Sequence, residues 1–96
     1  MDVSFSPEAL EQLEARRTWW KANRASADLF DIELGVAITT IGDRGASLPV
    51  VRNLEGRAIR RWMMPRTRCH LYFEVVASRV IVVSAWGARM GRLPAL

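Results

Sequence analysis

The chain is poor in several residue types, and each shortage limits what the protein can do. Of its 14 basic residues only Lys21 is lysine, so nearly all of its positive charge is arginine, which holds anions but cannot act as a base. The single cysteine, Cys69, cannot form an intramolecular disulfide and gives no spacing for metal ligands. No apolar run approaches the roughly 18 residues of a membrane span, and no basic segment followed by an apolar stretch opens the chain. We therefore expect a cytoplasmic protein with no membrane contact, no metal and no cofactor.

Acidic residues are scarce in the second half of the chain. Residues 44–96 contain two acids and ten bases, a net charge of +8, whereas residues 1–43 contain eight acids and four bases, a net charge of −4. This polarity predicts an anionic partner, which could be a nucleic acid, a phosphate or an acidic protein segment.

The 96 residues form one domain, and its first half has helical periodicity after a short strand. Residues 2–5 alternate and predict the strand, and a serine followed by proline and glutamate at positions 6–8 predicts a helix start. The first helix is expected over 7–23, with an apolar stripe of Leu10, Leu13 and Trp20. A second helix begins at Ala25 or Ser26 and ends at Gly42, and the two form an antiparallel hairpin. Its inward side chains are Phe30, Leu34, Ala37, Ile38 and Ile41.

The second half has period two, which is typical of strands. Strands are expected over 50–54, 58–64, 68–76 and 79–86, and the last two form a hairpin around Ala77 and Ser78. A two-residue loop would place four pairs on the core side: Val75 with Val80, Phe73 with Val82, Leu71 with Ser84, and Cys69 with Trp86. The other side would carry His70, Tyr72, Glu74, Arg79, Ile81, Val83 and Ala85, and a three-residue loop would shift this pairing. The predicted fold is α+β: an N-terminal strand, then an antiparallel helical hairpin packed on one face of a three- to four-stranded antiparallel sheet.

Four segments carry a resemblance to a known family. They are Val-Ser-Phe-Ser-Pro-Glu-Ala at 3–9, the pair Arg60 and Arg61, Arg-Thr-Arg-Cys-His-Leu-Tyr-Phe at 66–73, and Ala-Trp-Gly-Ala-Arg-Met-Gly-Arg-Leu-Pro-Ala-Leu at 85–96. In their order and spacing they resemble the RelE/ParE toxins of bacterial type II toxin-antitoxin systems. The resemblance implies a cytoplasmic toxin in a hetero-oligomeric complex with an acidic antitoxin, acting either on ribosome-bound mRNA, as RelE does, or on DNA gyrase, as ParE does.

The residues at the implied site favour the second activity. RelE-like enzymes use lysines in the second strand, arginines in the third strand and after the last one, and a tyrosine in the C-terminal tail. Here the second strand offers Arg60 and Arg61, no lysine follows Lys21, and no tyrosine follows Arg89. A gyrase-binding inhibitor needs no catalytic set, so we expect a non-enzymatic, ParE-like toxin. A ribosome-dependent endoribonuclease and a toxin-like binding module without activity stay open as alternatives.

Candidate site residues follow from the same comparison. His70, Tyr72 and Arg89 are the candidates for catalysis, although the favoured interpretation of His70 is a strand histidine that makes a structural or solvent hydrogen bond. Leu13, Trp19 and Arg61 are candidates for antitoxin contact. Trp86 is expected beneath the helices and Cys69 as a small buried hydrophobe. The candidates for contact with the target or with phosphate are Arg57, Arg60, Arg61, Arg68 and Arg89.

Overall fold

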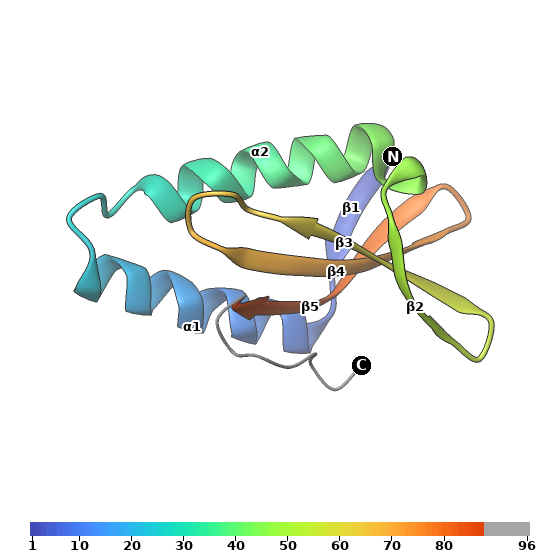
Figure 1. Cartoon of the computed structure of the whole chain (residues 1–96), viewed down its shortest axis with the longest axis horizontal. Coiled ribbons are helices and arrows are strands. Elements are labelled where there is room, and N and C mark those ends of the chain that lie inside the picture. The colour runs from blue at the N-terminus through green and yellow to red at the C-terminus, as the bar shows by residue number, and fades with distance from the viewer. Residues whose placement is uncertain (88–96) are drawn as a thin grey trace.

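A computed structural model describes residues 1–87 of the chain. The elements follow in the order β1 (Asp2–Phe5), α1 (Pro7–Asn23), α2 (Leu29–Arg44), a 3-10 turn η1 (Gly45–Ser47), β2 (Val50–Leu54), β3 (Arg57–Met63), β4 (Cys69–Val76) and β5 (Arg79–Gly87). Figure 1 shows the two helices running side by side along the sheet in opposite directions.

The five strands form one sheet in the order β1-β5-β4-β3-β2. Neighbours among β2, β3, β4 and β5 are antiparallel, whereas β1 joins the outer edge of β5 in parallel. The predicted α+β fold is therefore confirmed, and the first strand enlarges the predicted sheet to five strands. Both helices cover the same sheet face, because a single core cluster joins alternate residues of β4 and β5 to both helices. From the helices this cluster takes Ala9, Leu13, Trp20, Phe30, Ala37 and Ile41.

Helix α1 begins and ends where the sequence predicts. The Ser6 hydroxyl accepts a hydrogen bond from the Ala9 amide at 3.1 Å, which satisfies a backbone donor that the first helical turn leaves without a partner. One predicted inward residue is wrong: Leu10 is 55% exposed, because Ala9 takes the position against the sheet.

Helix α2 begins later than predicted, at Leu29. The Trp20 indole donates to the Ser26 carbonyl at 2.8 Å, which holds the connection in a non-helical conformation. The helix also passes Gly42 and ends at Arg44. Gly42 is buried where a side chain would lie 3.1 Å from the Met1 carbonyl, so this glycine allows a close approach and does not stop the helix.

The hairpin of β4 and β5 has the predicted two-residue loop, because Val76 pairs directly with Arg79. Both loop residues have positive φ, 49° at Ala77 and 61° at Ser78. A two-residue turn with this backbone matches the twist of the strands it joins, but it favours asparagine and glycine. The chain therefore accepts a local conformational cost at this turn.

A β-bulge changes the predicted register in the second half of this hairpin. Phe73 pairs with Val82 and Tyr72 with Ser84, so β5 has one extra residue, Val83, at this point. The predicted pairs Val75–Val80 and Phe73–Val82 are confirmed. Beyond the bulge Leu71 pairs with Ala85, His70 with Trp86, and Cys69 with Gly87, so the predicted pairs Leu71–Ser84 and Cys69–Trp86 are wrong. Trp86 consequently faces away from the helices, and Ala85 belongs to the core.

We expect the double substitution Ala77→Asn and Ser78→Gly to raise the free energy of unfolding by about 1 kcal/mol, because both residues would then suit positive φ. Chemical denaturation monitored by tryptophan fluorescence would measure the change. Asparagine at the exposed helical position Ala15 is the control and should destabilise the protein. Equal destabilisation by both variants would contradict the assigned turn.

Candidate functional site

The candidate site lies on the sheet face opposite the helices, here called the outer face. Side chains alternate along a strand, and directly paired residues share a face. Because Leu71 and Phe73 belong to the core, their neighbours His70, Tyr72 and Glu74 lie on the outer face. Cross-strand pairing adds Arg61 and Met63 from β3, and Ile81 and Trp86 from β5.

His70 and Tyr72 form a hydrogen-bonded pair at the centre of this face. The His70 Nδ1 and Tyr72 Oη atoms are 3.3 Å apart, and the two rings meet edge to face with centroids 6.0 Å apart. His70 is half-buried, whereas Tyr72 is 1% exposed. Tyr72 is therefore placed to orient His70, and only His70 of this pair offers an accessible ring edge.

The environment of His70 favours its neutral form. Burial lowers the pKa of His70 below its ordinary value, and the positive charges of Arg61 and Arg68 lower this pKa further. At neutral pH the imidazole is therefore unprotonated and able to accept a proton. An anion bound beside the two arginines would act in the opposite direction and favour the imidazolium.

The predicted arginines do not form one patch. Arg61 lies on the outer face opposite Tyr72, and Arg68 is exposed in the turn that leads into β4, with a φ of 59°. Arg57 also lies on the outer face, where its Nη2 atom is 2.8 Å from the Glu74 carboxylate. Arg60 points to the other face and donates from Nη1 to the Leu48 carbonyl. Arg89 lies outside the described residues.

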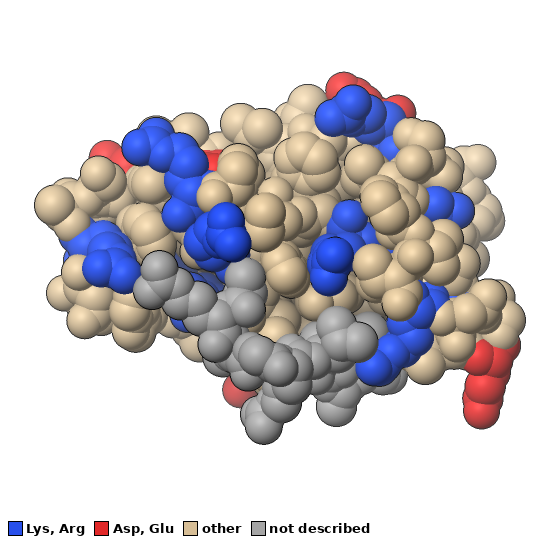
Figure 2. Space-filling view, viewed as in Figure 1, with Lys and Arg blue, Asp and Glu red and all other residues tan. Residues whose placement is uncertain are grey.

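Basic side chains are spread across one broad side of the molecule. Figure 2 shows this side, with acidic groups only towards its margins. The visible side of the molecule is therefore predominantly basic.

A buried glutamate that sequence analysis missed holds the turn between β3 and β4. The carboxylate of Glu33, 8% exposed on α2, accepts hydrogen bonds from the backbone amides of Arg66, at 3.0 and 3.1 Å, and Thr67, at 2.6 Å. The Arg68 amide then donates to the Met64 carbonyl at 2.9 Å, which closes the turn. Glu33 thereby fixes the backbone that presents Arg68 beside His70. The sequence did contain an indication of this role, because Glu33 is an acidic residue among the apolar, inward-facing positions of α2.

The candidate antitoxin contacts have different positions. Leu13 is 6% exposed and part of the core, so its side chain offers almost no surface for contact with an antitoxin. Trp19 is 40% exposed, with the guanidinium carbons of Arg16 and Arg24 each 5.2 Å from its ring centroid. This cation-π cluster keeps Trp19 at the surface of α1.

Cys69 is a buried core residue, as predicted. It is fully buried, and burial raises the pKa of its thiol to about 11, so the thiolate that a nucleophile requires is not formed at neutral pH. Within residues 1–87 no group of three or more histidine, cysteine, aspartate or glutamate side chains is placed to hold a metal ion. In the same part of the chain no helix is long and apolar enough to cross a membrane.

Comparison with known proteins supports the fold. No family model and no curated protein sequence matches the chain. Among solved structures, a chain of the "Chromosomal ParDE TA system from P. aeruginosa" superimposes with a TM-score of 0.67 at 10% sequence identity. The match covers 93% of this chain and 97% of that chain. The fold implied by the resemblance to the RelE/ParE toxins is confirmed by this likeness.

We expect an NMR titration to give His70 a pKa below its ordinary value of 6.5. Arg61→Gln should raise this pKa, and Arg68→Gln should raise it less, because each substitution removes a nearby positive charge. Arg79→Gln, at the far end of β5, is the matched control and should leave it unchanged. An unaltered His70 pKa in Arg61→Gln would contradict the assigned electrostatics.

The same shift makes stability depend on pH. The folded state disfavours the imidazolium, so the unfolded state binds more protons below pH 6.5. The contribution of His70 to stability is therefore intact above pH 6.5 and declines as the pH falls towards its folded-state pKa. Denaturation of His70→Gln, compared with the unsubstituted protein across this window, would isolate the effect.

We expect Glu33→Gln to lower the free energy of unfolding by about 2 kcal/mol, because the amide group keeps one acceptor oxygen but places a donor against backbone donors. Chemical denaturation measures the loss, and hydrogen exchange at Arg66 and Thr67 should accelerate. Glu11→Gln, on the exposed side of α1, is the control and should change stability by less than about 0.5 kcal/mol. Unchanged exchange at the turn would show that Glu33 does not hold it.

Proposed function

We propose that this chain is the toxin of a type II toxin-antitoxin system, which arrests growth by binding DNA gyrase and is neutralised by a cognate acidic antitoxin. The observation that carries the proposal is the shared fold: 93% of the chain superimposes on a chain of a ParDE toxin-antitoxin system with a TM-score of 0.67. Fold alone admits several activities, so the choice of target rests on the chemistry of the outer face.

The outer face is better equipped for binding than for catalysis. Cleavage of RNA by its own 2′-hydroxyl requires a base for that hydroxyl, an acid for the leaving oxygen and cations for the phosphate. Arg61 and Arg68 can supply the cations but not the proton transfers. Tyr72 is buried and Glu74 is held in an ion pair with Arg57, so within residues 1–87 His70 would have to serve both proton transfers. A gyrase inhibitor requires only complementary shape and charge.

One observation supports the endoribonuclease as a second candidate. His70 is neutral beside two arginines, so it could take a proton from a 2′-hydroxyl while Arg61 and Arg68 hold the phosphate. This arrangement supplies a base and cations on one face. The same protonated imidazole would then have to return its proton to the leaving oxygen.

The charge distribution supports an acidic neutralising partner. The net charge of +8 on residues 44–96 would attract an acidic antitoxin at long range, and increasing salt would slow its association. The resulting complex would be hetero-oligomeric. Trp19 and Arg61 remain candidate contacts, since both are accessible.

A supercoiling assay tests the choice of target. We expect the purified protein to inhibit DNA gyrase and to increase the yield of gyrase-cleaved plasmid. The double variant Arg61→Gln and Arg68→Gln should be roughly tenfold less potent, because two cations of the binding surface are lost. The control is Arg79→Gln, which also removes one arginine but lies at the opposite end of the β4–β5 hairpin from Arg68. It should retain potency within roughly twofold.

The ribosome-dependent alternative is tested in the same preparation. A coupled translation reaction should leave mRNA intact if gyrase is the target. Ribosome-dependent mRNA cleavage that His70→Gln abolishes, together with unaffected gyrase, would overturn the gyrase proposal. If gyrase remains active and mRNA remains intact, the chain would be assigned to the binding modules without activity.

A further inference from the structure

A cleft separates the two hairpins of the sheet at the end away from His70. The ladder between β3 and β4 runs from Met63–His70 to Arg60–Phe73 and stops there. Both strands continue beyond this point, β3 back to Arg57 and β4 on to Val76. Each stays paired with its own hairpin partner, as shown by Leu54 with Arg57 and Val76 with Arg79. The facing edges therefore diverge around a space of about 230 Å³.

The cleft offers backbone hydrogen-bonding groups on both of its walls. Residues 57–59 of β3 and 74–76 of β4 have no ladder partner across the gap within the described part of the chain. Three residues of extended chain span roughly 10 Å. An unpaired edge of this kind is a template on which another extended segment can form main-chain hydrogen bonds.

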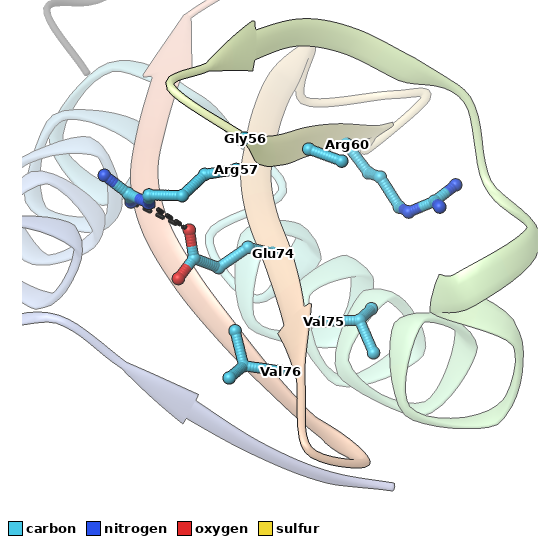
Figure 3. A pocket seen from close by; sticks show the side chains of 7 residues that line it. Gly56, Arg57, Arg60, Glu74, Val75 and Val76 are labelled. Atoms are coloured by element: carbon cyan, nitrogen blue, oxygen red, sulfur yellow. Dashed lines mark hydrogen bonds and ion pairs between the residues drawn. The ribbon is translucent and has the colours of Figure 1, made fainter.

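The side chains around the cleft define the segment that would fit. Figure 3 shows Arg57 and Glu74 joined on one side of the strands, while Arg60 and Val75 lie on the other. Val76, with 47% of its surface exposed, and Ala58 add apolar surface. Successive residues of an extended segment point to opposite faces, so two adjacent acidic residues could meet Arg57 on one face and Arg60 on the other.

Glu74 acts as an internal competitor for this position. A single oxygen of its carboxylate, Oε2, accepts from both Nε and Nη2 of Arg57 at 2.8 Å, so Glu74 occupies the donor edge of the guanidinium that an incoming carboxylate would use. Glu74 is 15% exposed and Arg57 is 53% exposed, so the arginine is the accessible partner of the pair. Arg60 is occupied only through one bond from Nη1 to the Leu48 carbonyl among the described contacts, and its guanidinium retains further donors.

We infer that this cleft is a docking site for an extended, acidic segment of a partner protein, which pairs with the free strand edges and places adjacent carboxylates on Arg57 and Arg60. Two observations indicate this occupant. The basic half of the chain is complementary to an acidic segment, and the unpaired strand edges can form main-chain hydrogen bonds only with an extended backbone. The neutralising antitoxin proposed above is the natural source of such a segment, and only that identification rests on the proposed function.

Binding of a defined peptide tests the inference. The probe is the capped octapeptide Val-Thr-Val-Glu-Glu-Val-Thr-Val, and the control peptide has both glutamates replaced by glutamine. NMR titration of the full chain should show saturable shifts at residues 57–60 and 74–76 with the acidic peptide. The control peptide should bind at least roughly tenfold more weakly.

Variants of the chain separate the cleft from general charge attraction. Arg57→Gln and Arg60→Gln should each weaken binding by roughly fivefold or more. Arg66→Gln, in the turn that follows the opposite end of β3, should change binding by less than about twofold. Glu74→Gln should tighten binding by roughly threefold, because it releases Arg57 and removes a like charge. A gain in affinity cannot result from misfolding, so this variant keeps the test valid if either arginine variant loses stability.

Three outcomes would overturn the inference. They are an absence of saturable shifts up to about 1 mM peptide, shifts spread over the outer face with equal weakening by Arg66→Gln, and concentration-dependent shifts at the cleft without peptide, which would assign it to a second copy of the chain. Because gyrase is absent from this titration, a negative result here leaves the target proposal intact. Failure of the gyrase assay likewise leaves the cleft assignment intact.

Discussion

The β-bulge at Val83 is the constraint on which both faces of the sheet depend. By adding one residue to β5 it reverses the facing of Ala85, Trp86 and Gly87, so Ala85 and Gly87 turn towards the helices and Trp86 turns away. Small residues at these core positions allow α1 to approach β5 closely: a side chain at Gly87 would lie 3.5 Å from the Arg16 guanidinium. The same shift places Trp86 beside His70. Core packing and the composition of the candidate site therefore have one origin.

Two polar side chains from the helices accept hydrogen bonds from backbone amides that the sheet ladders leave unpaired. Gln12 of α1 accepts from the Ala85 amide at 2.8 Å and from the Ser84 hydroxyl at 3.0 Å, immediately after the bulge. Glu33 of α2 accepts from two amides of the turn between β3 and β4. Buried backbone donors without partners are costly, so each contact compensates a local irregularity of the sheet. Each helix thus fixes one of the two segments that lead into the candidate site.

Periodicity and capping residues made most of the fold predictable. Ser6 and Pro7 located the start of α1, and alternation located the four strands of the second half to within one residue at each end. The face that carries His70, Tyr72 and Glu74 followed from the two-residue loop. The separation of Arg60 from Arg61 also follows from simple alternation, although sequence analysis grouped them as one candidate set.

The errors share a physical cause: side-chain contacts fix these irregularities, and the periodicity of the sequence does not reveal such contacts. No glycine or proline indicates the bulge at Val83; Ser6 of the helix cap and Gln12 hold it, since the Ser6 hydroxyl donates to the Val83 carbonyl at 3.2 Å. The late start of α2 depends on the Trp20 indole, six residues from its acceptor. The early end of the β3–β4 ladder has no local signal. The sequence therefore predicted the part of the candidate site made by His70, Tyr72 and Arg61. It did not predict the role of Glu33 or the cleft.

The two groups of arginines are joined by a single strand, and this suggests how a partner could block the outer face. Arg57 at the cleft and Arg61 beside Tyr72 lie on the same face of β3, four residues apart, which corresponds to roughly 13 Å. A segment seated in the cleft and continuing along β3 would reach Arg61 after about four more residues. Arg61 is also one of the charges that keep His70 neutral, so a carboxylate placed on it would favour protonation of the imidazole. Coverage of the outer face and a change in the protonation of His70 would then follow from the same contact, without any rearrangement of the fold.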